Sequence, residues 1–204
     1  MPKEIDTNTE QKILDSATKV FHEKGYDGTR MQEIADDANI NKGLLHYYFK
    51  SKDSLFETIF SLALGKLISK IQVILELEIP LEMKIDLMVE EYMNMLSKNS
   101  YLPRFVLNEL NKNPEKFIAK HIGNNMKNTF SGFALSVKKE VDAGLIRQVD
   151  ARQLFMNIIS MIIFPFIGRP MIQVVIGIDN KEFQELIKER KDHIKSFVKQ
   201  AIKK

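Results

Sequence analysis

The chain has 204 residues, of which 44% are hydrophobic and 28% are charged, and its formal net charge is +3. This composition is typical of a soluble globular protein of one or two domains. The absence of cysteine excludes disulfides, thiolate metal sites and cysteine nucleophiles, and it fits a reducing cytoplasm. Residues 1–10 are polar and mixed in charge, so we expect no secretory signal.

The N-terminal quarter of the chain predicts short helices separated by helix breakers. Thr7 and Glu10 have the spacing of a capping box, and apolar residues then recur at helical spacing. Gly25 and Gly28 are expected to end this first helix. Thr29, with a glutamine three residues later, predicts the start of a second one.

A tight turn is expected between this second helix and a third. Asn39 tolerates the left-handed backbone that such a turn requires, and Asn41 is a good N-cap for a helix that reaches about Phe49. Ser51 caps a fourth, long helix. Its apolar residues share one side: Leu55, Phe56, Ile59, Phe60, Ala63 and Leu67.

Helical patterns continue to the C-terminus, and strand signals are nearly absent. Leu81–Leu96 is amphipathic. Pro103 and Pro114 occupy first-turn positions, and the helix after Pro114 is expected to run to Gly144. A final helix is predicted over Lys181–Ile202. Its candidate N-caps are Asp179 and Asn180.

One predicted helix, Ala151–Phe164, is apolar nearly all round. Asp150 caps it, and Pro165 and Pro170 are expected to break it. The charge-free stretch Leu154–Gly168 falls short of the roughly 20 apolar residues that span a bilayer, so we interpret it as a buried helix. The whole pattern predicts an all-α fold of about nine or ten helices.

Residues 29–48 have the spacing of a helix-turn-helix. Ala35 supplies the small residue where the two helices cross. Three apolar side chains can fill the core beneath: Ile34, Ile40 and Leu44. In this motif the second helix enters the major groove of DNA. Its expected outer side carries groups that can hydrogen-bond or stack: Lys42, His46, Tyr47 and Tyr48.

The charge of this region is informative only locally. Residues 1–52 carry eight Lys or Arg against nine Asp or Glu, a net of −1, so the overall charge does not indicate nucleic acid. Asn41–Lys52, however, contains no acidic residue. Its cations form a small basic face: Lys42, Lys50 and Lys52.

Five segments follow one another in a familiar order within residues 9–60. They are Ile13–Ala17, Phe21–Tyr26, Thr29 through Ile34 and Ala35, Lys42–Phe49, and Ser51–Leu55. Together they resemble the N-terminal domain of the tetracycline-repressor-like (TetR/AcrR) family of bacterial regulators. The resemblance implies a three-helix DNA-binding head, a helical ligand domain and a two-fold dimer made by the last long helices. Most members of the family are repressors released by a small molecule.

The resemblance also implies roles for single residues. Two stand at a helix start facing phosphate: Thr29 and Arg30. Five face the groove: Asn41, Lys42, Gly43, His46 and Tyr47. Two clamp the DNA backbone: Tyr48 and Lys52. The chain departs from the family pattern at Asn39, where glycine is usual, and at His46, where tyrosine is common; the second departure alters the groups that read bases.

Enzyme functions find no support in the sequence. The four histidines lack metal-site spacing, and the nine glycines form no phosphate-binding loop. No carboxylate pair is implied, so we expect no catalytic residue, metal or cofactor. The alternative function is a helical interaction or sensor protein with a vestigial helix-turn-helix, which failure to bind upstream DNA would favour.

The rest of the chain is rich in methionine and phenylalanine, which suits an adaptable ligand pocket as well as plain core packing. We expect residues 1–52 to form the DNA-binding domain, and residues 53–204 the ligand-binding and dimerisation domain, with the helix from 52 shared. Candidate ligand-binding residues are Met88, Phe105, Glu109, His121, Asn125, Phe130 and Asn157.

The apolar helix 151–164 cannot have a solvent face, so we expect a second subunit to cover one side of it, with 181–202 beside it. Candidate interface residues are Phe155, Ile159, Ile162, Leu186, Ile194 and Phe197. The sequence thus predicts a cytoplasmic homodimeric repressor, without a membrane segment. Its expected partners are double-stranded operator DNA and a small apolar or amphipathic effector.

Overall fold

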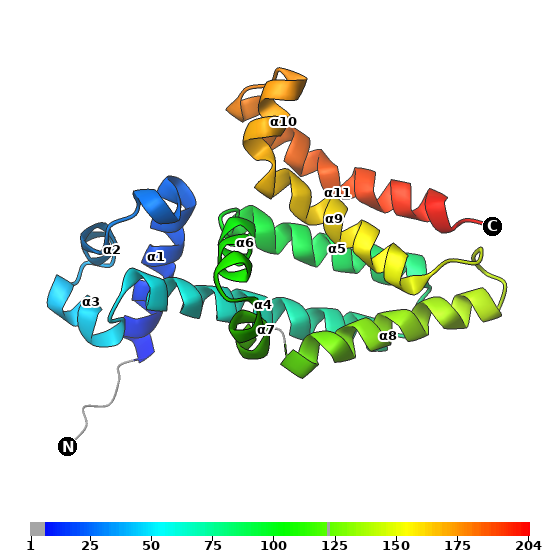
Figure 1. Cartoon of the computed structure of the whole chain (residues 1–204), viewed down its shortest axis with the longest axis horizontal. Coiled ribbons are helices and arrows are strands. Elements are labelled where there is room, and N and C mark those ends of the chain that lie inside the picture. The colour runs from blue at the N-terminus through cyan, green and yellow to red at the C-terminus, as the bar shows by residue number, and fades with distance from the viewer. Residues whose placement is uncertain (1–6, 122) are drawn as a thin grey trace. The chain divides into compact units, whose positions relative to one another are not determined.

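The computed structural model describes residues 7–121 and 123–204, and every regular element in them is a helix (Figure 1). The all-α prediction is therefore confirmed. Residues 1–10 were expected to carry no secretory signal, and residues 1–6 of this segment lie outside the described residues. The described helices number eleven rather than nine or ten. They are α1 Thr7–Gly28, α2 Met31–Asp37, α3 Lys42–Tyr48, α4 Lys52–Glu76, α5 Leu81–Lys98, α6 Leu102–Lys112, α7 Pro114–His121, α8 Gly123–Asp142, α9 Ala151–Ile167, α10 Arg169–Ile176 and α11 Asn180–Ile202.

The chain folds into two compact units. The first unit comprises the residues up to Gly65 together with Lys98–Leu102, and the second comprises Lys66–Ser97 and Pro103–Lys204. The chain therefore passes between the units at three places: within α4, at the end of α5 and at the start of α6. The predicted boundary at residue 52 falls at the start of α4, a helix that belongs to both units.

The first unit is built around an aromatic cluster. The Phe21 ring of α1 meets the Phe56 ring of α4 edge-on, with 4.8 Å between centroids, and both side chains are fully buried. Tyr101, from the connection between α5 and α6, lies 5.2 Å from Phe56 and 5.9 Å from Phe21. Burial raises the pKa of Tyr101 to about 12. The three rings fix α1, α4 and this connection to one another.

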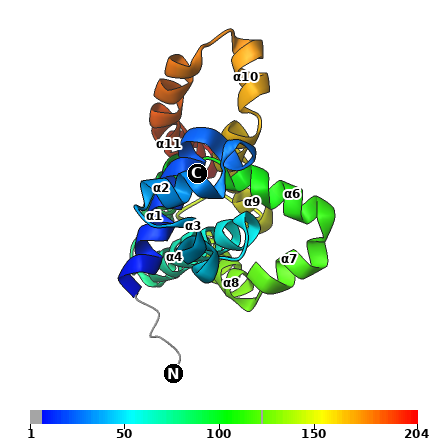
Figure 2. The ribbon, with the colours of Figure 1, turned by 90° about the vertical axis from the view of Figure 1, so that its left-hand side faces the viewer.

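The second unit packs α9 between α8 and α11. Leu154, Ile158 and Ile162 recur at four-residue spacing and bury one side of α9 in the core. α10 connects the ends of α9 and α11 (Figure 2). Ion pairs join α5 to α11, where the Glu90 carboxylate accepts from Lys191 at 2.6 Å and Lys195 at 2.7 Å. These two ammonium groups lower the pKa of Glu90 to about 2.

Side-chain caps fix the starts of several helices. Asp150 accepts from the Arg152 backbone N–H, and Asp179 rather than Asn180 caps α11. The expected box at Thr29 is wrong, because Arg30 occupies the N-cap and Glu33 accepts from its backbone N–H at 2.9 Å. The expected single helix from 115 to 144 is also wrong, since α7 ends at His121 and α8 begins at Gly123, which takes a left-handed φ of 37°.

Pro165 does not end α9, contrary to expectation, because Arg190 repairs the defect that it causes. Proline has no backbone N–H, so the Met161 carbonyl, four residues earlier, loses its helical donor. The Arg190 guanidinium of α11 donates to this carbonyl from both Nε and Nη2 at 3.3 Å. The helix continues to Ile167, after which the chain bends by 80° into α10. α10 itself was not predicted.

Two helical segments are long and apolar enough to cross a membrane by length and composition alone. One is α4, with a mean hydropathy of 1.6 over its most apolar 18 residues, and the other is the bent pair α9–α10. Core helices of soluble proteins have the same properties, and 39% of the α4 window is buried within the chain. These segments are therefore weak evidence for a membrane span. Only the second of them stood out in the sequence, because its stretch is free of charge.

The stability that the Arg190–Met161 hydrogen bonds contribute should depend on the presence of Pro165. Replacing Arg190 with Met leaves the part-buried Met161 carbonyl unsatisfied and should lower the free energy of unfolding by about 1–3 kcal/mol. In a Pro165→Ala background residue 165 regains its N–H, so the same Arg190→Met change should cost much less. Urea unfolding at one fixed protein concentration measures this double-mutant cycle. Equal losses in both backgrounds would contradict the proposed repair.

Candidate nucleic-acid interface

The turn between α2 and α3 has the geometry that a helix-turn-helix requires. Asn39 adopts a φ of 53°, the only positive value at a non-glycine position in the described part of the chain. Its neighbours close the turn with backbone hydrogen bonds, from Ala38 N–H to the Ile34 carbonyl at 3.0 Å and from Ile40 N–H to the Ala35 carbonyl at 2.9 Å. Asparagine thus supplies the left-handed backbone for which glycine is usual.

The start of α3 is fixed by its first residues. The Asn41 Oδ1 atom accepts from the Leu44 backbone N–H at 2.8 Å, which confirms Asn41 as the N-cap. A Cβ atom at Gly43 would lie 3.2 Å from this Oδ1, so glycine leaves room for the cap. Asn41 and Gly43 therefore shape the helix end, and the side-chain oxygen of Asn41 is already engaged there.

Burial separates an inner and an outer side of α3. Leu45 is fully buried and Phe49 nearly so, whereas Leu44, which we expected in the core, is only half-buried. The one-residue error arises because α3 is so short that the spacing alone allows either leucine to face inward. Three of the predicted groove-facing side chains are exposed: Lys42, His46 and Tyr47. Tyr48 is half-buried, and its ring meets that of Tyr47 edge-on at 5.6 Å.

Thr29 does not face solvent as expected. It is 2% exposed, and its hydroxyl donates to the Gly25 carbonyl at 2.6 Å, at the kinked end of α1. The expectation of a phosphate contact through this hydroxyl is therefore wrong. Arg30, the next residue, is exposed at the start of α2, so the phosphate contact predicted for it is compatible with its position.

Lys52 lies at the predicted position, the first turn of α4, but its ammonium group points into the first unit. It donates to the Tyr26 carbonyl at 2.8 Å and to the Thr29 carbonyl at 3.0 Å, and it lies 4.3 Å from the centre of the Tyr26 ring. These contacts correct the expectation of a simple phosphate clamp. Lys52 ties α4 to the carbonyl groups at the end of α1.

Two of the three acidic residues of α2 are paired with lysines of α1. Lys24 donates to Glu33 at 2.7 Å, and Lys19 donates to Asp37. Hydrogen bonds from these ammonium groups lower the pKa of both carboxyls. Such exposed pairs add little stability, but they offset two negative charges on the helix that precedes α3. The acid-free segment Asn41–Lys52 thus presents donors and aromatic edges suited to phosphate and base contacts.

Comparison with known proteins identifies the family. Residues 13–59 match the model of the bacterial regulatory proteins of the tetR family, and residues 82–198, more than half of the chain, match the tetracyclin repressor-like C-terminal domain. The chain belongs to the TetR family. This confirms the resemblance inferred from the N-terminal motifs.

TetR-family relatives and structures agree with this assignment. The icaADBC biofilm-operon negative transcriptional regulator IcaR of Staphylococcus aureus is 52% identical over 46 residues, which are 22% of this chain and 25% of IcaR. The match thus spans about a quarter of that relative. The crystal structure of PfmR from Thermus thermophilus has a TM-score of 0.64 at 22% identity, over 89% of this chain and 96% of PfmR. FadR of Bacillus subtilis, solved with stearoyl-CoA, has a TM-score of 0.64 at 18% identity, over 92% of this chain and 97% of FadR.

The predicted effector residues of this TetR-family chain do not converge on one cavity. Met88 is buried in the core, Phe130 packs on Phe155, and Glu109 pairs with Lys112 at 3.0 Å. The other four are half-buried or exposed on α6 to α9: Phe105, His121, Asn125 and Asn157. Their role as ligand contacts stays a prediction. In the part of the chain that the structure describes, no three His, Asp or Glu side chains could hold a metal ion.

The candidate dimer residues divide into two groups. Ile162 and Ile194 are each 1% exposed and belong to the core of their own chain, so they cannot form the outer surface as expected. Phe155 and Ile159 are half-buried on α9. Leu186 and Phe197 are exposed, at 38% and 63%. The interface on these helices stays a prediction, and sequence periodicity could not say which apolar side of each helix turns outward.

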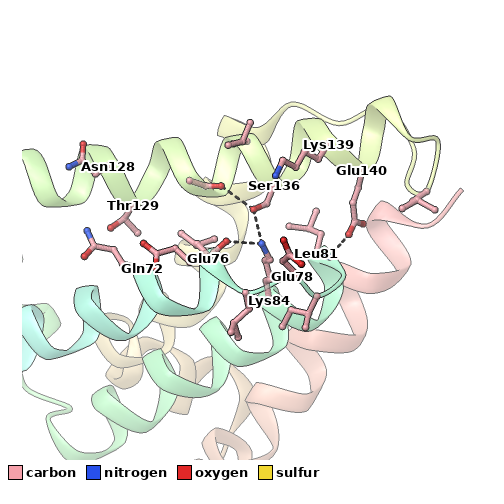
Figure 3. Close-up of a pocket in the computed structure, with 16 residues that line it drawn as sticks. Gln72, Glu76, Glu78, Leu81, Lys84, Asn128, Thr129, Ser136, Lys139 and Glu140 are labelled. Atoms are coloured by element: carbon pink, nitrogen blue, oxygen red, sulfur yellow. Dashed lines mark hydrogen bonds between the residues drawn. The ribbon is translucent and has the colours of Figure 1, made fainter.

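The second unit also contains a hollow of about 780 Å³, and the residues that line it were not among the ligand-binding residues predicted from the sequence. It is lined by the end of α4, the start of α5 and the middle of α8, and its floor is the buried side chain of Lys84 (Figure 3). A signal did exist in the sequence. Lys84 lies three residues after Leu81 and four before Met88, on the apolar side of α5, where a lysine is unusual.

The internal role of Lys52 can be separated from a DNA contact. Lys52→Met removes two charge-assisted hydrogen bonds to backbone carbonyls, and it should lower the free energy of unfolding by about 1–3 kcal/mol without any DNA present. Lys50→Met, at an exposed neighbouring position, should leave it unchanged. Urea unfolding of the free protein measures both. If Lys52→Met had the stability of the parent, the internal role of Lys52 would be contradicted and a phosphate contact would again be the better interpretation.

Proposed function

We propose that the protein is a dimeric transcriptional repressor that binds operator DNA through α3 and is released by a small effector bound in the second unit. The observation that carries this proposal is the exposed, acid-free α3 segment on a helix-turn-helix whose turn and cap are intact, in a TetR-family chain. Enzymatic activity is not part of the proposal, and the cytoplasm is its expected location.

Known relatives support the direction of regulation. IcaR is named as a negative transcriptional regulator. The segment that is similar to IcaR has 46 residues, about the length of the segment 13–59 that matches the tetR-family model. We therefore propose repression rather than activation. FadR of Bacillus subtilis was solved with stearoyl-CoA, which supports a small-molecule effector in a chain of this fold.

In the proposed complex, Lys42 and Arg30 contact phosphate, and His46 and Tyr47 reach base edges. All four side chains are exposed, and Lys42 and His46 are one helical turn apart on the same side of α3. Phosphate contacts position the protein without sequence preference, whereas base contacts confer it. Asn41, Gly43 and Tyr48 shape or buttress this surface.

Dimerisation would present two copies of α3 to a palindromic operator. The proposal rests on the many exposed apolar side chains of α9, α10 and α11, because exposed apolar side chains that lie together are typical of interfaces. The residues of this surface are 38% to 82% exposed: Met156, Phe164, Met171, Val174, Val175, Ile176, Leu186 and Phe197.

Effector release would act through α4. This helix begins with Lys52, shortly after the recognition helix, and ends in the second unit, so it is the direct covalent route between DNA and effector. A ligand that favours one orientation of α4 changes the separation of the two recognition helices. The coupling is reciprocal, so operator DNA should weaken effector binding by the same factor, typically about 5- to 150-fold.

The DNA-binding surface can be tested by substitution. Lys42→Ala should weaken binding to all sequences and reduce the salt dependence by about 0.9 in the log–log slope for each phosphate that is no longer neutralised. His46→Ala and Tyr47→Ala should instead reduce the preference for operator over random DNA. Fluorescence anisotropy with labelled upstream DNA at several salt concentrations measures both. Lys12→Ala, at an exposed position on α1, is the matched control. Parental behaviour of all three variants would remove α3 from the interface.

The dimer surface can be tested in the same way. Phe197→Asp places a charge on the proposed interface while leaving the core intact, because Phe197 is 63% exposed. The variant should sediment as a folded monomer of 23.6 kDa, whereas the parent should sediment at twice that mass. Leu62→Asp, at a 57% exposed position on α4, should remain dimeric. A parent that is monomeric at micromolar concentration would overturn the proposed assembly.

A further inference from the structure

The floor of the 780 Å³ hollow is a buried ammonium group whose hydrogen-bond partners are neutral. Lys84 is 9% exposed, and its Nζ donates to the Leu75 carbonyl at 2.7 Å and to the Ser136 hydroxyl at 3.3 Å. Among the described residues it forms no ion pair within 4.0 Å. A buried charge with only neutral partners is costly. The hollow therefore contains a charge that an anion would compensate.

A second cation lies beside the first. Lys139 of α8 also lines the hollow, and in Figure 3 its side chain and that of Lys84 approach Ser136 from opposite sides. Burial, and then the Lys139 ammonium, lower the pKa of Lys84. Two ammonium groups that line the same hollow favour an anion between them.

The acidic residues around the hollow do not occupy this position. Glu140 accepts from the Leu81 backbone N–H at the start of α5, and its charge raises the pKa of Lys84 by less than burial and Lys139 lower it. Glu76 and Glu78 are exposed at the rim, where solvent screens their charge. Their presence disfavours a highly charged ligand, so a single negative charge suits the hollow best.

The rim of the hollow also carries apolar side chains that are open to solvent. Leu77, Leu135 and Leu145 are 41%, 55% and 67% exposed, and all three line the hollow. Its volume lies within the range of small-molecule sites. Exposed leucines around a cationic floor would be covered by the apolar part of a ligand whose charged end lies deeper.

We propose that this hollow binds a small amphipathic monocarboxylate, with its carboxylate at Lys84 and Lys139 and its apolar chain against Leu77, Leu135 and Leu145. This site differs from the one expected from the sequence, since none of the seven candidate ligand residues lines it. The chemical class of this ligand follows from the residues of the hollow itself. Only the effect of ligand binding on DNA binding rests on the proposed function.

Octanoate and octan-1-ol are matched probes, because they share an apolar chain and differ in the charge of the head. Calorimetry with the full chain should find one octanoate site per chain, with an affinity at least about ten-fold above that for octanol, as expected for one charge-assisted contact. Lys84→Met preserves the length of the side chain and should abolish this preference. Lys139→Met, which is exposed and cannot disturb the core, should reduce it several-fold. Lys138→Met, whose lysine pairs with Asp142 outside the hollow, should leave it unchanged.

Equal affinity for octanoate and octanol, or an unchanged octanoate affinity in folded Lys84→Met, would overturn the site. Calorimetry contains no DNA, so its result does not depend on operator binding. Operator affinity is measured separately, with and without octanoate. Failure to bind operator overturns the proposed function and leaves the site standing, whereas insensitivity of octanoate binding to Lys84→Met overturns the site and leaves the function standing.

Discussion

The contact between the Phe21 and Phe56 rings is the constraint on which the DNA-binding unit depends. Both side chains are fully buried, and they join α1 to α4 within the unit that carries the helix-turn-helix. Such edge-on aromatic pairs contribute about 0.5–1.5 kcal/mol beyond the area they bury, and they also fix an angle. Because Tyr101 packs against both rings, a segment 45 residues beyond Phe56 in the chain is part of the same core. The buried Leu45 and Phe49 anchor α3 to this unit.

The head was largely predictable because its signals are local. Asn41 and Ser51 act as caps, and Asn39 adopts the left-handed turn, as their residue types indicate. Errors appear where a side chain meets a partner outside its own local pattern. Thr29 and Lys52 both bind carbonyl groups at the end of α1, and no pattern around either residue shows that these carbonyls are available. Exposure and partner choice there are tertiary properties.

The second unit was predictable in type but not in detail. The periodicity of α9 indicated burial on two sides, yet only packing decides that Ile162 turns inward while Phe164 is half exposed. The effector candidates were chosen for polarity on apolar helices, but the residues that line the hollow come from other positions. The continuation of α9 through Pro165 depends on Arg190, 25 residues later in the chain. The structure thus adds long-range partners that a periodic pattern cannot contain.

The three crossings of the chain between its units have a practical consequence for protein engineering. A fragment that stops within α4 would contain the entire helix-turn-helix but would lack Tyr101 and Leu102, which are buried in the same unit. The freshly uncovered edges of Phe21 and Phe56 would then face water, and such a fragment would associate through them. A chimera that transplants this DNA specificity onto another sensor must therefore carry two separate pieces of sequence, the N-terminal helices and the short stretch Lys98–Leu102, rather than a single cassette.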